Sequence, residues 1–133
     1  MVELLNARYA EALICRDNDA HFAAIVTMGS LLEGALLQVL TERDPKFRAQ
    51  VRDRKEKGEP EQKYSLSNLI DMAHKRNYIA RDARDFTQVL RDYRNFVHPR
   101  VQLDFAVTPD ADLVDGCWYA AIMALRDLDA TLS

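Results

Sequence analysis

One apolar stretch constrains the fold of this chain more than any other feature. Residues 23–40 are nearly all apolar over eighteen positions, and Glu33 and Gln38 interrupt them. A run of this length has to be buried, either in a membrane or at the centre of a globular domain. It has no positive flank and no aromatic belt, and the remaining sequence is polar enough for water. We therefore expect a long central helix over residues 20–42 and no membrane association.

The composition favours further helices around that centre. With 133 residues, 48% of them hydrophobic and 29% charged, the chain suits one soluble globular domain over residues 1–133. Four glycines and four prolines leave few turns for an all-β fold. Cys15 and Cys117 lack metal-ligand spacing, and no secretory signal precedes them. We expect reduced thiols in a cytoplasmic protein.

Apolar periodicity predicts where the other helices lie. It indicates helices over residues 2–16, 66–75, 82–98 and 109–131. Side chains that cap helix starts precede three of the segments: Asp17-Asn18-Asp19 before the central helix, Ser65 or Ser67 before the third, and Thr108-Pro109 before the last. Short connections between such segments predict an all-α fold, an up-and-down bundle of four to five helices.

A charged excursion interrupts this pattern at about residues 43–63. Residues 41–63 contain eight Lys and Arg against six Asp and Glu, whereas residues 102–133 contain one Arg against six Asp. The excursion has helical propensity, but it offers only Phe47, Ala49 and Val51 for burial, and Gly58 and Pro60 end it. We expect an exposed helix there. A solvated charged face is the ordinary interpretation, and contact with RNA is the alternative.

The candidate functional site is a polar stripe near the end of the fourth predicted helix. Four residues at positions i, i+3, i+4 and i+7 share one helix face: Arg91, Arg94, Asn95 and His98. An apolar stripe lies about 110° further round the same helix, formed by Phe86, Leu90, Tyr93 and Val97. The helix can therefore bury one side and present a cationic edge that carries a titratable histidine.

These residue types suit the cleavage of RNA without a metal ion. The reaction needs a base for the ribose 2′-hydroxyl, cations for the phosphorane and an acid for the leaving oxygen. His98 can serve as base or acid, and Arg91 and Arg94 can bind phosphate oxygens through paired donors. Asn95 can orient the scissile phosphate or form a hydrogen bond with a ribose. One histidine performs one proton transfer at a time, so a second copy across a two-fold axis would complete the set, which predicts a homodimer. On spacing alone, a solvent-exposed helix surface remains an alternative.

The same residues resemble the Arg-Xaa(4–6)-His signature of the HEPN superfamily (higher eukaryotes and prokaryotes nucleotide-binding). Measured from Arg91, the match is Arg-Asp-Xaa5-His; from Arg94 the spacer is one residue too short, although Asn95 is the usual follower of the motif arginine. Residues 29–34 (Gly-Ser-Leu-Leu-Glu-Gly) and 65–70 (Ser-Leu-Ser-Asn-Leu-Ile) extend the resemblance over most of the chain. Which arginine has the motif role stays open.

The resemblance implies a small helical bundle that dimerises with the motif at its interface. It also implies metal-independent endoribonuclease activity, often in toxins or phage-defence components, with no cofactor. The alternative is a non-catalytic HEPN-like module that binds a nucleotide, RNA or a protein partner such as an antitoxin. A purely structural dimerisation protein is a third possibility. In one toxin branch a tyrosine two residues after the histidine is modified, but Arg100 stands there in this chain, which argues against an antitoxin of that nucleotidyltransferase kind.

Glu33 is the sole charged residue of the apolar stretch. An unpaired buried carboxylate would cost several kcal/mol or become protonated. We therefore predict that Glu33 supports the site through an ion pair with Arg91 or Arg94; the alternative is that it reaches solvent at a helix edge. His21 and His74 lack acidic or cysteine neighbours at ligand spacing, so we expect them to be surface or capping residues rather than metal ligands.

Overall fold

The fold is all-helical in the part of the chain that the structure describes. The computed structural model describes residues 2–58, 64–80, 90 and 109–132. These residues form five helices and no strand: α1 (Val2–Asp17), α2 (His21–Arg43), α3 (Pro45–Glu56), α4 (Leu66–Lys75) and α8 (Ala111–Leu132). The predicted all-α bundle of four to five helices is confirmed.

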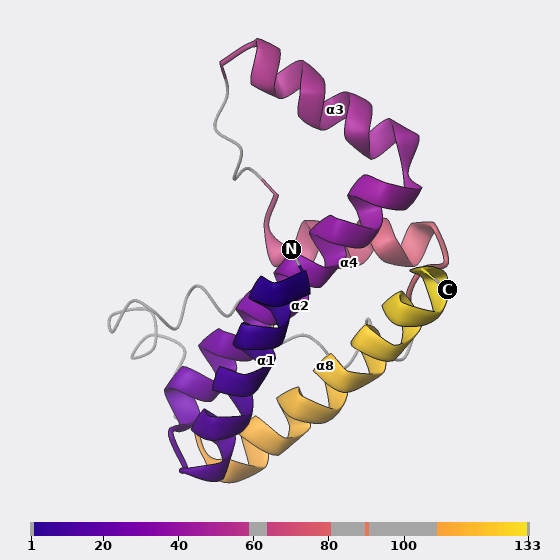
Figure 1. Cartoon of the computed structure of the whole chain (residues 1–133). Coiled ribbons are helices and arrows are strands. Elements are labelled where there is room, and N and C mark those ends of the chain that lie inside the picture. The colour runs from indigo at the N-terminus through magenta and orange to yellow at the C-terminus, as the bar shows by residue number, and fades with distance from the viewer. Residues whose placement is uncertain (1, 59–63, 81–89, 91–108, 133) are drawn as a thin grey trace.

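Helix α2 is the centre of this arrangement. It contacts α1, α3, α4 and α8, and Figure 1 shows α1 and α8 running along it while α4 lies against its C-terminal half. Its largest fully buried side chains are Ile25, Met28, Leu32, Leu36, Val39 and Leu40. The apolar stretch at residues 23–40 is therefore the core of the protein, because the neighbouring helices enclose it on several sides.

The length and composition of α2 also match those of a membrane span. Its most apolar window has a mean hydropathy of 1.7, and 61% of that window is buried inside the protein. A core helix has the same length and composition, and here the burial is supplied by α1, α4 and α8.

The small side chains on one face of α2 admit α1 at close range. A methyl group added to Gly34 would lie 2.8 Å from Cδ2 of Leu5 in α1. About two helical turns earlier on α2, Thr27 is buried, and its hydroxyl lies 4.0 Å from the Cys15 sulfur. This face of α2 is thus occupied by α1 of the same chain.

The residues between α1 and α2 end the first helix rather than begin the second. The Asn18 side chain donates to the Ile14 carbonyl at 2.8 Å, and Asp19 adopts a left-handed φ of 56°. Ala20, which precedes α2, makes no side-chain cap hydrogen bond. The predicted N-cap role of residues 17–19 is therefore wrong, because the Asn18 side chain and the amides of Asp19 and Ala20 donate to the free carbonyls of α1, and Ala20 takes the N-cap position of α2.

The starts of α4 and α8 follow their capping side chains. The Ser65 hydroxyl accepts a hydrogen bond from the Asn68 amide at 3.1 Å, so Ser65 rather than Ser67 caps α4. At α8 the Asp110 carboxylate accepts from the Leu113 amide at 2.8 Å. Helix α8 therefore begins at Ala111, two residues after the predicted start at Pro109, because Asp110 caps it; Thr108 lies outside the described residues.

Truncating a leucine of the α2 core should destabilise the fold strongly. Leu36 is 0% exposed, so Leu36→Ala leaves a cavity and should lower the free energy of unfolding by roughly 2–5 kcal/mol. Leu4→Ala is the matched control, because Leu4 is 57% exposed on α1 and its loss should cost less than about 0.5 kcal/mol. Urea denaturation monitored by circular dichroism measures the free energy of unfolding of both variants. Equal effects of the two substitutions would contradict α2 as the core.

Candidate functional site

The predicted catalytic residues lie outside the part of the chain that the structure describes. This holds for Arg91, Arg94, Asn95 and His98, so their arrangement stays a prediction. Leu90, immediately before them, is described: it is helical and 0% exposed. Leu90 belongs to the predicted apolar stripe, and its burial agrees with the orientation expected for that helix.

Glu33 lies on α2 among buried neighbours. It is partly buried, next to Leu32, which is completely buried. The Glu33 side chain has an interaction partner in the structure. Since Arg91 and Arg94 fall outside the described residues, the predicted ion pair of Glu33 with one of them stays a prediction.

A second group of polar residues gathers where α2, α3 and α4 meet, around Asp44. The Asp44 amide donates to the Leu40 carbonyl at 2.9 Å and ends α2. Its Oδ1 accepts from the amides of Lys46 at 3.0 Å and Phe47 at 3.4 Å, which begins α3. Pro45 occupies the first turn of α3, where a missing amide hydrogen costs nothing. One residue therefore fixes the angle between two helices.

Arg76, just after α4, donates a further hydrogen bond to the Asp44 carboxylate. Its Nε donates to Asp44 Oδ2 at 3.0 Å, and the Asp44 side chain is only 8% exposed while that of Arg76 is 42% exposed. Burial by itself would raise the pKa of Asp44, but the hydrogen bond and charge of Arg76 and the two amides outweigh it and lower the pKa. Asp44 is therefore ionised at neutral pH.

A cationic pocket opens beside this pair, between α3 and α4. Its volume is about 350 Å³, and it is lined by Asp44, Lys46, Phe47, Gln50, Met72, Lys75 and Arg76. Three of these side chains are cationic and one is anionic, so the pocket has a net positive charge. A small anionic group is the kind of ligand that it suits.

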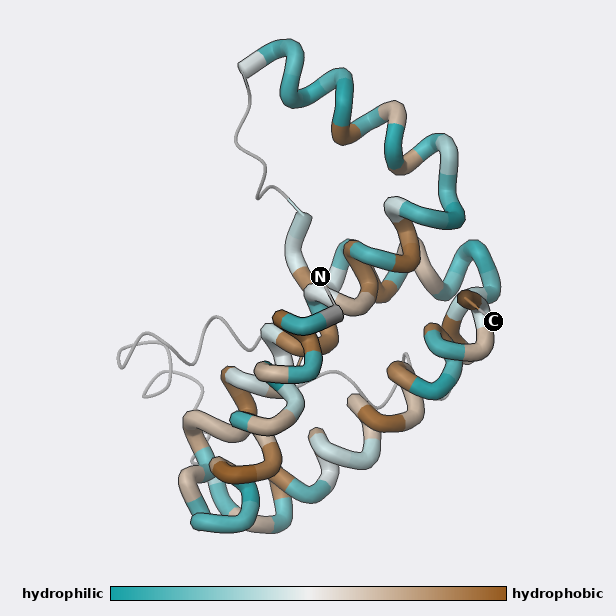
Figure 2. Tube along the Cα trace, viewed as in Figure 1, coloured by the Kyte–Doolittle hydropathy of each residue, from teal (hydrophilic) through white to brown (hydrophobic). Residues whose placement is uncertain are grey.

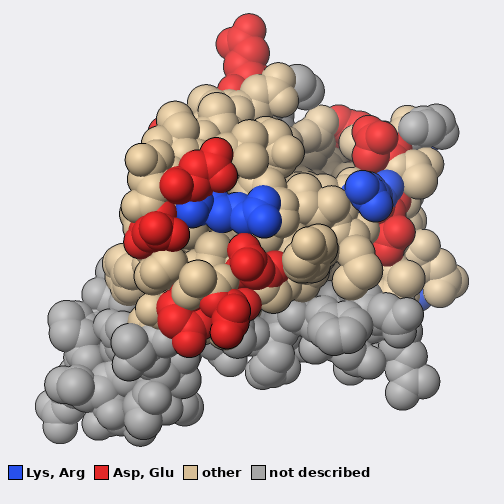
Figure 3. Space-filling model, turned by 90° about the horizontal axis from the view of Figure 1, so that it is seen from below, with Lys and Arg blue, Asp and Glu red and all other residues tan. Residues whose placement is uncertain are grey.

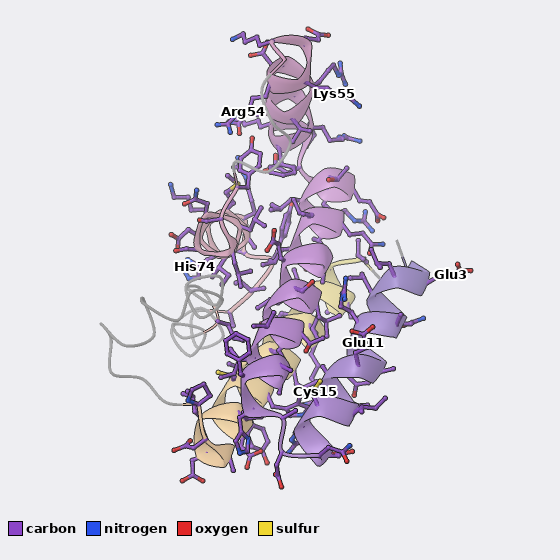
Figure 4. The ribbon with its side chains drawn as sticks, turned by 90° about the vertical axis from the view of Figure 1, so that its left-hand side faces the viewer. Glu3, Glu11, Cys15, Arg54, Lys55 and His74 are labelled. Atoms are coloured by element: carbon purple, nitrogen blue, oxygen red, sulfur yellow. The ribbon has the colours of Figure 1, made fainter. Side chains whose placement is uncertain are left out.

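Helix α3 carries basic residues away from the core. It contains five Lys and Arg against two acidic residues, and Phe47 is its only fully buried side chain. Figure 2 shows its hydrophilic surface, and in Figure 4 Arg54 and Lys55 project on opposite sides of the helix. Tyr64 holds α3 in place: its ring centroid lies 5.1 Å from that of Phe47, and the Arg54 guanidinium lies 4.7 Å above it.

The opposite end of the bundle is acidic. The end of α1 and the start of α8 meet there, and the sequence places Asp17, Asp19, Asp110, Asp112 and Asp115 in these segments. Seen from below, red acidic groups surround the few basic ones on the described part of that face (Figure 3). Arg16 is engaged by Asp115 at 3.4 Å and by the Trp118 ring at 4.8 Å. A polyanion is therefore favoured at the α3 end and disfavoured at this one.

Other candidate groups in the described residues have structural roles. Cys117 is buried, and that burial raises the pKa of its thiol to about 11, so it is protonated and a poor nucleophile at neutral pH. His21 is the first residue of α2 and His74 lies in the last turn of α4, and both are partly exposed. Among the described residues, no three His, Cys, Asp or Glu side chains gather in a group able to hold a metal ion.

No protein-family model, no curated protein and no solved structure matches the chain. Sequence reasoning missed the pairing of Asp44 with Arg76, although an Asp-Pro pair at a helix start is a capping signal. The partner of Asp44 lies 32 residues further along the chain, and only folding brings the two together.

Replacing Asp44 by asparagine should make stability less dependent on pH. Asparagine keeps an oxygen that can cap α3 but removes the charge, so the free energy of unfolding at pH 7 should fall by about 1 kcal/mol. Because folding lowers the pKa of Asp44, its charge stabilises the protein above the ordinary carboxyl value of 3.8, and this contribution is lost as the pH falls below it.

The difference between wild type and Asp44→Asn should therefore shrink towards pH 3 or so, as measured by urea denaturation across a pH series. Asp17→Asn is the control, because Asp17 is exposed and its substitution should change stability by less than about 0.5 kcal/mol. A difference that is equally large at low and neutral pH would contradict the role of the Asp44 charge.

Proposed function

We propose that this chain is a metal-independent endoribonuclease of the HEPN type, acting as a homodimer. The observation that carries the proposal is the stripe of Arg91, Arg94, Asn95 and His98 in the sequence. The helical, fully buried Leu90 supports it, because Leu90 belongs to the apolar stripe that the sequence places about 110° from the polar stripe.

In the proposed reaction His98 accepts the proton of a ribose 2′-hydroxyl. The 2′-oxygen then attacks phosphorus and the bond to the 5′-oxygen breaks, which yields a cyclic phosphate and a 5′-hydroxyl. Arg91 and Arg94 stabilise the extra negative charge of the phosphorane, and Asn95 orients a phosphate oxygen. His98 of the second subunit donates the proton that the leaving 5′-oxygen needs.

The alternative is a non-catalytic module that binds RNA or a nucleotide. The basic helix α3 and the cationic pocket at its base favour this second function, because neither contains any residue of the polar stripe. Both functions share an anionic ligand. They differ in whether His98 moves protons or only contacts phosphate.

Substitution of His98 tests the catalytic function directly. The purified protein should cleave single-stranded RNA in excess EDTA, and His98→Ala should slow cleavage by roughly 10²–10⁴-fold, the usual contribution of a general acid or base. Gel analysis of end-labelled RNA measures the rate. His21→Ala is the matched control: it removes a histidine outside the stripe and should leave the rate unchanged.

Circular dichroism of both variants keeps the comparison to folded protein. RNA cleavage that persists in folded His98→Ala would remove His98 from the mechanism. Binding of RNA by the wild type without any cleavage would establish the module in place of the enzyme.

Mixed dimers test whether two subunits share one site. If each site needs both His98 side chains, a heterodimer of wild type and His98→Ala is inactive. After subunit exchange, activity should then fall with the square of the wild-type fraction, so that an equal mixture keeps about a quarter of the activity of an all-wild-type sample at the same total concentration. A linear decline to one half would show instead that each subunit acts by itself.

A further inference from the structure

The pocket between α3 and α4 contains Arg76, whose side chain is held in position by Asp44. Arg76 donates through Nε to Asp44, and no acceptor among the described residues takes a hydrogen bond from its Nη1 or Nη2 group; the side chain is 42% exposed. Asp44 in turn is fixed by the backbone of two helices. An arginine positioned in this way pays little conformational entropy when it binds an oxyanion.

Two lysines add charge at the same place. Lys46 comes from the first turn of α3 and Lys75 from the last turn of α4, and both line the pocket with Arg76. Within the part of the chain that the structure describes, neither lysine forms an ion pair with a carboxylate. Asp44 offsets one of the three positive charges, so the pocket keeps a net charge of about +2 that a ligand can neutralise.

The remaining lining gives the pocket its size and a neutral donor. The Gln50 amide can donate to an oxygen, and Phe47 and Met72 supply apolar walls. The volume of about 350 Å³ exceeds the roughly 30 Å³ that one water occupies by an order of magnitude. A phosphate group with part of its sugar fits such a space, whereas an isolated halide ion would leave most of it to water.

We propose that this pocket binds a phosphate group, with Arg76, Lys46 and Lys75 as its ligands and Asp44 as the residue that positions Arg76. That the phosphate belongs to RNA rests on the proposed function. The basic helix α3 starts at the pocket, so a bound strand can continue along its lysines and arginines. A free nucleotide offers the same phosphate chemistry, and the experiment separates the two sources.

Paired charge removals test the pocket in the full-length chain. In a His98→Ala background, which prevents loss of the ligand by cleavage, the pocket variant Lys46→Ala/Lys75→Ala is compared with the control Arg8→Ala/Arg126→Ala. Both lose two positive charges, and neither control residue lies on α3 or in the pocket: Arg8 is paired with Glu11 on α1, and Arg126 is exposed on α8. Arg76 is left in place, because its removal would strand the Asp44 charge.

Fluorescence anisotropy with labelled single-stranded RNA gives the affinity at several salt concentrations. The pocket variant should bind roughly tenfold more weakly, and its slope of log K against log salt should fall by roughly 0.7 for each lost phosphate contact. The control should stay within about twofold of its parent. Calorimetric titration with ATP forms the second arm.

Each outcome decides the matter. If the pocket variant binds RNA more weakly and the control variant does not, the pocket is a phosphate site for RNA. If the pocket variant loses affinity for ATP but not for RNA, the pocket binds the phosphate of a free nucleotide. Equal behaviour of pocket and control variants towards both ligands overturns the proposal. RNA cleavage is measured separately, with protein that retains His98. The proposed phosphate pocket and the proposed nuclease activity can therefore be refuted independently of each other.

Discussion

The burial of α2 is the constraint on which the described fold depends. Eighteen nearly apolar residues cannot be left in water, and a single partner helix covers only part of such a surface. Helices α1, α4 and α8 each contribute an apolar side, and together they enclose Ile25, Leu32 and Leu36 completely. The positions of these helices follow from α2, since each packs on it more extensively than on any other part of the described core.

Asp44 marks the point where the chain leaves this core. A carboxylate that is nearly buried has to be compensated, and here two backbone amides and Arg76 compensate it. The same contacts turn the chain sharply from α2 into α3 and tie the base of α3 to the end of α4. The outward direction of the basic helix is therefore set by one buried charge together with a small apolar contact, in which Phe47, the only completely buried residue of α3, packs against Tyr64.

Apolar residues stand beside the cationic ones in both proposed anion sites. In the sequence the fully buried Leu90 precedes the polar stripe, and in the structure Phe47 and Met72 line the pocket with Arg76. Charge is then separated along the bundle, with acidic residues gathered at the turn between α1 and α2 and the start of α8. Such a distribution steers a polyanion towards α3 despite a net charge of −3.

The sequence by itself determined the class of the fold and most helix bounds, because apolar periodicity and caps such as Ser65 act over a few residues. It also marked the polar stripe at residues 91–98, whose spacing needs only a helix to define a face. The structure corrected two helix ends although their contacts are equally local: Asn18 and Asp19 close α1, and Asp110 starts α8. The tertiary structure alone joined Asp44 to Arg76 and formed the pocket beside them, because a contact across 32 residues depends on how α4 packs against α2 and leaves no periodic trace in the chain.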